Sequence, residues 1–168
     1  MTKMIFVNLP VADLAASTAF YSALGFTQNH MFSDETASGM EWSDTIKVML
    51  LSHDKWKSFT SKPIVDAHSA AQVALCVSME SREAVDEITE TAGKHGGKAD
   101  INPKQEFGDM MYGRSFEDPD GHVWEPMWMN PAMATDGPPA EAAVDAILAN
   151  QPERYEETAG NKMSRVGM

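Results

Sequence analysis

Several features that would place a chain outside a reducing, aqueous compartment are missing from this sequence. Its 168 residues include one cysteine, Cys76, so a disulfide framework is excluded. No apolar run approaches the ~20 residues that a membrane-spanning helix needs. The first residues also lack the long apolar stretch of a secretory signal. We therefore expect a cytoplasmic protein with no membrane partner.

Basic residues are scarce as well. The chain has 13 Lys and Arg against 25 Asp and Glu, which gives a formal net charge of −12. Binding to a phosphate backbone relies on clustered Lys and Arg, so we expect no nucleic-acid partner. The acidic balance mildly favours a cationic or neutral ligand, although solubility alone also explains it.

What the sequence does contain is an internal repeat. Residues 6–11 and 72–77 share one alternating apolar pattern, which is typical of a strand. Each stretch runs into a segment of helical periodicity that ends near a glycine. A repeated unit of this kind predicts a duplicated module. The alignment also makes Phe6 and Gln72 counterparts in the two modules.

The repeat predicts an α+β fold of two tandem βαβββ modules, with a C-terminal extension. In the first half we expect strands at 4–11, 26–32, 39–43 and 46–51, and a helix at 14–24 between Asp13 and Gly25. In the second half we expect strands at 73–79, 98–101, 110–117 and 123–128, and a helix at 81–94. The predicted modules span residues 4–59 and 72–130. The connection between them spans 60–71, and a helix at 54–59 precedes it. A tail at 131–168 contains one short helix at 140–149.

Glu125 stands in an apolar row on the last predicted strand. A carboxylate there must find a partner. If the turn of residues 118–121 closes a two-residue hairpin, Arg114 lies opposite Glu125 and pairs with it. A bulge at Gly121 would shift the register by one residue and break that pair. The pair and a catalytic carboxylate are both open interpretations at this point.

Two motifs carry a family resemblance. Residues 8–14, with Ser17, Phe20-Tyr21 and residues 24–26, resemble the opening signature of the vicinal oxygen chelate superfamily, and residues 113–125 resemble its closing signature. That superfamily includes glyoxalase I, bleomycin-resistance proteins, fosfomycin-resistance thiol transferases and extradiol dioxygenases. The resemblance implies that the modules pair into a curved-sheet cup, within one chain or by exchange between subunits. We expect a homodimer.

Metal-using members of that superfamily hold a divalent cation at the floor of the cup. Carried over by position, Glu125 matches a metal ligand or the catalytic base, and Gln72 stands where many relatives have histidine. Phe6, at the third position, cannot coordinate a metal. The predicted metal residues are therefore Gln72 and Glu125, and a bound metal would be Zn, Ni, Mn or Fe. The residues expected to line the ligand cup are Phe6, Asn8, Tyr112, Arg114 and Met127.

Three histidines also bear on the cup. His53 and His68, near or within the connection, could fold over it. His122 follows the 118–121 turn, as it does in many relatives, and we expect a structural role for it.

Two functions of different classes follow. The first is a protein that binds a small molecule in the cup without the conventional full metal site, as bleomycin-resistance proteins do. The second is a divalent-metal-dependent lyase, isomerase or dioxygenase that acts on a substrate with neighbouring oxygens. Whether the protein is an enzyme stays open. Because Phe6 occupies a ligand position, we favour the first.

Overall fold

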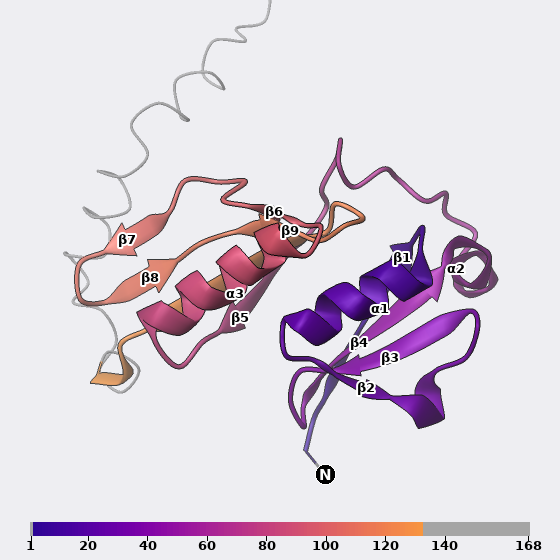
Figure 1. Cartoon of the computed structure of the whole chain (residues 1–168), viewed down its shortest axis with the longest axis horizontal. Coiled ribbons are helices and arrows are strands. Elements are labelled where there is room, and N and C mark those ends of the chain that lie inside the picture. Colours follow the sequence, from indigo (N-terminus) through magenta and orange to yellow (C-terminus); the bar gives the residue numbers. More distant parts are fainter. Residues whose placement is uncertain (1, 133–168) are drawn as a thin grey trace, which may run out of the picture. The chain divides into compact units, whose positions relative to one another are not determined.

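Two sheets, each packed against a helix, make up the part of the chain that the computed structural model describes, residues 2–132 (Figure 1). The first module contains β1 (Ile5–Val11), α1 (Leu14–Ala23), β2 (Thr27–Asn29), the 3-10 helix η1 (His30–Phe32), β3 (Ala37–Glu41) and β4 (Ile46–Ser52). Helix α2 (His53–Phe59) follows it. The second module contains β5 (Ala74–Ser78), α3 (Arg82–Lys94), β6 (Lys98–Ala99), β7 (Gln105–Phe107), β8 (Met111–Gly113), β9 (Phe116–Glu117) and β10 (Val123–Met129).

The strand order repeats between the modules. In the first sheet the order is β1-β4-β3-β2, and β1 runs parallel to β4. In the second sheet β10 has β5 on one side, parallel to it. On its other side lie β8 and β9, each antiparallel to β10. The predicted α+β class and the duplicated βαβββ unit are therefore confirmed. The predicted tail helix at 140–149 lies outside the described residues.

The main helices lie within one residue of their predicted bounds. The Asp13 side chain accepts a hydrogen bond from the backbone N–H of Ala16 at 3.0 Å and caps α1. Gly25 follows the end of α1 with a φ of 94°, a left-handed conformation that glycine adopts without steric cost. Ser81 caps α3 in the same way as Asp13 caps α1, through the N–H of Ala84.

Several strand boundaries differ from the prediction because side chains bind the backbone locally. The strand predicted at 26–32 ends at Asn29, whose side chain accepts from the N–H of Met31 and starts η1. The strand predicted at 39–43 begins earlier, at Ala37, directly after a turn held by Asp34. The strand predicted at 110–117 is divided into β8 and β9. The strand predicted at 98–101 ends at Ala99, and the sequence did not predict β7.

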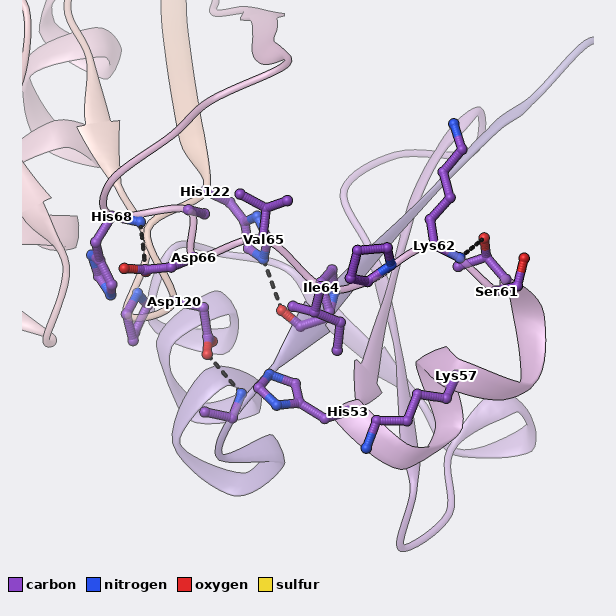
Figure 2. A pocket seen from close by; sticks show the side chains of 16 residues that line it. His53, Lys57, Ser61, Lys62, Ile64, Val65, Asp66, His68, Asp120 and His122 are labelled. Atoms are coloured by element: carbon purple, nitrogen blue, oxygen red, sulfur yellow. Dashed lines mark hydrogen bonds between the residues drawn. The ribbon is translucent and has the colours of Figure 1, made fainter.

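A turn of the second module forms hydrogen bonds with the first module. Residues 118–122 make up this turn, which we call the 118–122 turn. Asp120 accepts hydrogen bonds from the N–H of Ala12 at 2.7 Å and from the hydroxyl of Ser17 at 2.8 Å. His122 Nε2 lies 2.8 Å from the carbonyl oxygen of Pro10 (Figure 2). The expected structural role of His122 is confirmed.

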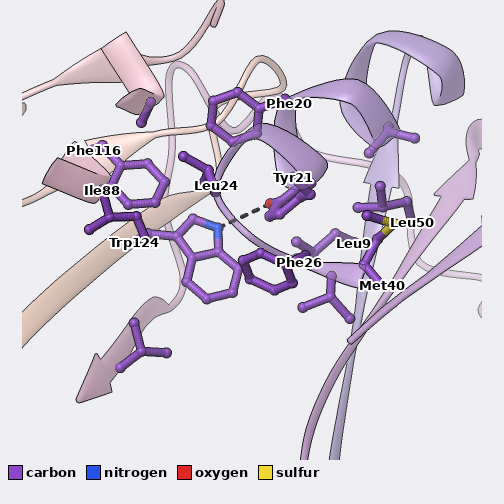
Figure 3. Packing of buried hydrophobic residues seen from close by; sticks show 14 residues of the cluster. Leu9, Phe20, Tyr21, Leu24, Phe26, Met40, Leu50, Ile88, Phe116 and Trp124 are labelled. Atoms are coloured by element: carbon purple, nitrogen blue, oxygen red, sulfur yellow. Dashed lines mark hydrogen bonds between the residues drawn. The ribbon is translucent and has the colours of Figure 1, made fainter. Parts of the chain in front are cut away.

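One hydrophobic core spans both modules (Figure 3). Trp124 of β10 stacks on Phe116, with ring centroids 6.3 Å apart, and meets Tyr21 of α1 edge to face at 5.9 Å. Phe20 of α1 also contacts Phe116 at 6.3 Å. The modules are therefore joined by aromatic packing as well as by the 118–122 turn.

Candidate functional site

Glu125 lies on the face of β10 that points away from α3. Trp124 and Pro126 are buried on the helix side, whereas Glu125 is partly exposed on the other. Its register partner on the parallel strand β5 is Cys76, a free and exposed cysteine. Burial, and then the charge of Glu125, raise the pKa of the Cys76 thiol. This thiol is therefore not activated as a nucleophile.

Gln72 and Glu125 line the same hollow, as their predicted shared role requires. The hollow has a volume of about 480 Å³ and includes His68, Asn102 and Glu117 among its polar lining residues. Gln72 is exposed, just ahead of β5. The tertiary structure thus brings together two residues that are far apart in sequence, and places a carboxylate, an amide and an imidazole around one space.

Phe6 and Asn8 lie on the other module. Both are exposed on β1, and Phe6 keeps 59% of its surface accessible. Their register partners on β4 are Lys47 and Met49. Neither Phe6 nor Asn8 is among the residues that line the hollow with Gln72 and Glu125. Within one chain, the residues assigned to the cup therefore form two separate groups.

The Arg114–Glu125 pair, which required a two-residue hairpin, does not form. Arg114 donates its backbone N–H to the carbonyl of Pro126, because Gly121 adopts a φ of 92° and the register shifts by one residue. The Arg114 side chain consequently points to the opposite face of the sheet from Glu125. There its guanidinium binds Asp86 and Asp100, each at 2.7 Å. The bulge alternative is the one that the structure adopts.

Tyr112 shares the α3 side of the sheet with Arg114. Its hydroxyl donates a hydrogen bond of 2.7 Å to Asp86. Burial and this bond to Asp86 raise the pKa of Tyr112 to about 12. The structure thus gives Tyr112 and Arg114 a place in a polar network beneath α3, rather than on the face that carries Glu125. Met127, two residues after Glu125, does lie on the Glu125 face.

In the part of the chain that the structure describes, the expected metal positions do not supply a full set of ligands. Within residues 2–132, no group of three His, Cys, Asp or Glu side chains is placed to hold a metal ion. Glu125 contributes one carboxylate and Gln72 one neutral amide, and Phe6 contributes no ligand atom. Catalytic sites for Zn and similar ions generally use three imidazole or carboxylate ligands.

His68 is a lining residue whose position the sequence left open. It lies in the connection, and its Nδ1 is 3.8 Å from a carboxylate oxygen of Glu117. It borders the hollow that contains Gln72 and also a second hollow on the side of α2. A Cβ at Gly121 would come within 2.5 Å of the backbone nitrogen of His68, so the connection lies directly on the 118–122 turn. No pattern in the sequence of the connection indicated this contact.

Comparisons with known proteins point to one family. The family model described as Glyoxalase/Bleomycin resistance protein/Dioxygenase superfamily matches residues 3–125. No curated protein matches the chain.

None of the helices described for this chain is long and apolar enough to cross a membrane.

Solved structures share the fold at low sequence identity. A hypothetical protein from S. aureus is 23% identical with a TM-score of 0.63, and the alignment covers 76% of this chain and 94% of that one. A glyoxalase/bleomycin resistance protein/dioxygenase family enzyme from Burkholderia phytofirmans is 18% identical with a TM-score of 0.62, covering 77% and 100%. A glyoxalase-related enzyme from Fulvimarina pelagi is 20% identical with a TM-score of 0.62, covering 78% and 90%.

Proposed function

Because the chain belongs to the Glyoxalase/Bleomycin resistance protein/Dioxygenase superfamily, we propose that it binds a small organic molecule in a cup whose floor carries Gln72 and Glu125. The single observation that supports this proposal most is the hollow that both residues line. Phe6 takes the place of the third ligand, so binding proceeds without the conventional full metal site. We place this activity in the cytoplasm, since Cys76 is free.

The chemistry of the hollow suits recognition by hydrogen bonds. Glu125 offers acceptors only, whereas the Gln72 amide offers both a donor and acceptors. Met127 adds a polarisable apolar surface on the same face as Glu125. A ligand with hydrogen-bond donors next to an apolar body would match these groups, as is usual for small-molecule sites.

A second copy of the chain completes the cup in this proposal. Strand β1 is an edge of the first sheet and β5 an edge of the second, and the two strands do not pair with each other. Ile5, Phe6 and Val73, at or next to these edges, are 55%, 59% and 62% exposed. Unpaired edges with exposed apolar residues favour pairing with another strand. Pairing β1 of one chain with β5 of another would bring Phe6 and Asn8 opposite Gln72 and Glu125.

The dimer is tested by the solution mass of the protein. The parent chain should elute as a dimer in size-exclusion chromatography with light scattering. Ala74→Lys places a charge on the open edge strand β5 and should shift the protein toward monomer. Thr27→Lys, on β2 at the far edge of the first sheet, is the matched control and should stay dimeric. A monomeric parent would contradict the proposed cup.

The alternative function is that of a divalent-metal-dependent lyase, isomerase or dioxygenase. The observation in its favour is that Gln72 and Glu125 share one hollow, as two ligands of a common ion would. Metal analysis of the purified protein, and titration with Zn²⁺, Ni²⁺, Mn²⁺ and Fe²⁺, distinguish the two proposed functions. We expect no stoichiometric tight binding. A tightly bound ion that is lost in Glu125→Ala would establish the metal enzyme instead.

Ligand binding itself is tested with a cell metabolite extract. The protein is incubated with the extract and separated by gel filtration, and retained molecules are identified by mass spectrometry. Glu125→Gln and Gln72→Ala should each lose the retained molecule, because the first neutralises a carboxylate of the lining and the second removes an amide from it. Glu106→Gln, an exposed change on β7, is the control and should retain it. Equal retention by all variants would exclude this hollow as the binding site.

A further inference from the structure

A second hollow, larger than the one that Gln72 and Glu125 line, lies between α2 and the connection. Its volume is about 750 Å³, within the range of small-molecule sites. One wall is formed by His53 and Lys57 of α2, and another by Ile64 and Val65 of the connection. Pro10, near the end of β1, adds to the apolar part. Gln72 and Glu125 do not line it.

The α2 side of this hollow presents two nitrogen groups together. His53 and Lys57 are four residues apart on one helix, so their side chains share a face. In Figure 2 the His53 ring lies below Ile64 and the Lys57 side chain runs beside it, whereas Lys62 points away from both. Within the described residues the His53 imidazole makes no hydrogen bond. Lys57 pairs only with Asp54, whose side chain is 94% exposed, and such a pair is weak.

The carboxylates that border the hollow are directed elsewhere. Asp120 uses both of its oxygens for the N–H of Ala12 and the hydroxyl of Ser17. Asp66 accepts from the backbone N–H of His68 at 3.1 Å, and its side chain points toward His68 and away from α2 (Figure 2). His53 and Lys57, whose ion pair with the exposed Asp54 is weak, therefore remain available to an anion on the α2 side. Exposed charges more than about 8 Å away are largely screened at physiological salt.

We propose that this hollow binds a small organic anion, a carboxylate or a monophosphate ester that carries an apolar group. The anionic group lies between His53 and Lys57, which donate charge-assisted hydrogen bonds to its oxygens. The apolar part packs against Ile64, Val65 and Pro10. This site is separate from the cup and does not depend on the function proposed for it.

The test uses the full chain and defined probes. Phenyl phosphate and benzoate are titrated into ¹⁵N-labelled protein, with inorganic phosphate and neutral benzyl alcohol as comparisons. We expect saturable binding of at least one aromatic anion, with shifts at the amides of Ala12, Ile64 and Val65. The phosphate and carboxylate arms show which anionic group the site prefers. Benzyl alcohol should bind about tenfold more weakly, since it lacks the charge that each donor recognises.

Variants that remove each donor then locate the anion. Lys57→Gln should weaken binding about fivefold, the effect of one solvent-accessible ion pair. His53→Ala removes a hydrogen-bond donor and should weaken binding by a similar factor. Lys55→Gln removes the same charge from the same helix outside the lining and should leave the affinity unchanged. Lack of saturable binding by both aromatic anions, equal binding of benzyl alcohol, or an equal loss in Lys55→Gln and Lys57→Gln would each overturn the proposal.

Discussion

The hydroxyl of Tyr21 donates a hydrogen bond of 2.6 Å to Asp118 Oδ2, although the two residues belong to different modules. The same hydroxyl accepts from the indole N–H of Trp124 at 3.0 Å. Asp118 Oδ1 in turn accepts from the N–H groups of Asp120 and His122 and shapes the 118–122 turn. One buried carboxylate thus couples the packing of α1 to the turn that precedes the strand of Glu125.

This coupling predicts the cost of removing the hydroxyl. Tyr21→Phe leaves both Asp118 Oδ2 and the Trp124 N–H without their partner in a buried site. The free energy of unfolding in urea should fall by about 1–3 kcal/mol. Tyr112→Phe is the comparison, and it should cost less, because Asp86 keeps its bond to Arg114 and is partly exposed. A larger loss in Tyr112→Phe would contradict the role given to the Tyr21 network.

A second prediction concerns the close approach of Gly97 to the first module. A Cβ at Gly97 would overlap the carbonyl oxygen of Glu117 and lie 2.9 Å from Phe20 Cε2. Gly97→Ala should therefore lower the free energy of unfolding by about 1–3 kcal/mol, as overpacking does. Gly113→Ala adds the same methyl group where the nearest atoms are 3.6 Å away, and it should be nearly neutral. Urea unfolding of both variants measures the difference.

A third prediction concerns stability in acid. Hydrogen bonds from Arg114 hold the pKa of Asp100 below its ordinary value, against the smaller opposing effect of partial burial. A lowered folded pKa contributes stability that is present above the unfolded value, about 3.9, and is lost as the pH falls through the folded value. The free energy of unfolding should therefore fall more steeply below about pH 4 in the parent than in Asp100→Asn.

Asparagine also suits the φ of 55° that Asp100 adopts. Urea unfolding between pH 3 and pH 7 gives the two slopes. Asp44→Asn, an exposed change in the turn after β3, serves as the control and should keep the slope of the parent. Identical slopes for the parent and Asp100→Asn would show that the Arg114 bonds do not shift the proton equilibrium.

A fourth prediction restores the position that Phe6 occupies. If the cup forms as proposed, Phe6→His adds an imidazole to the set of Gln72 and Glu125. Loss of an outer-shell partner alone changes metal affinity roughly 10–100-fold, so a new direct ligand should tighten Zn²⁺ binding at least about tenfold. Calorimetric titration of the parent and of Phe6→His with Zn²⁺ measures the two affinities.

Two controls accompany this variant. Phe59→His places an imidazole on α2, where the aromatic ring is 62% exposed, and it should not change the affinity. Adding Glu125→Ala to Phe6→His should abolish the gain. Equal affinity in the parent and Phe6→His would mean that Phe6 does not face Glu125 in the assembled protein.

Much of the fold follows from local chemistry. Asp13, Gly25 and Ser81 set helix ends through contacts with residues a few positions away, and the repeated alternation at 6–11 and 72–77 identifies the duplicated module. These signals are local, so one sequence carries them in full. The strand at 26–32 shows the limit. There the Asn29 side chain competes with the sheet for backbone hydrogen bonds, and it ends the strand early.

The candidate site likewise combines features that the sequence predicts with features that only the tertiary structure decides. From the sequence alone, the family resemblance predicts that Gln72 and Glu125 stand at ligand positions. Side-chain chemistry also excludes Phe6 as a metal ligand, and neither inference needs coordinates. Only the tertiary structure decided where Arg114 points. A left-handed Gly121 shifts the register by one residue, and a shift of one residue turns a side chain to the other face of a sheet. It also placed the connection on the 118–122 turn, since contacts between distant segments depend on packing that no local pattern records.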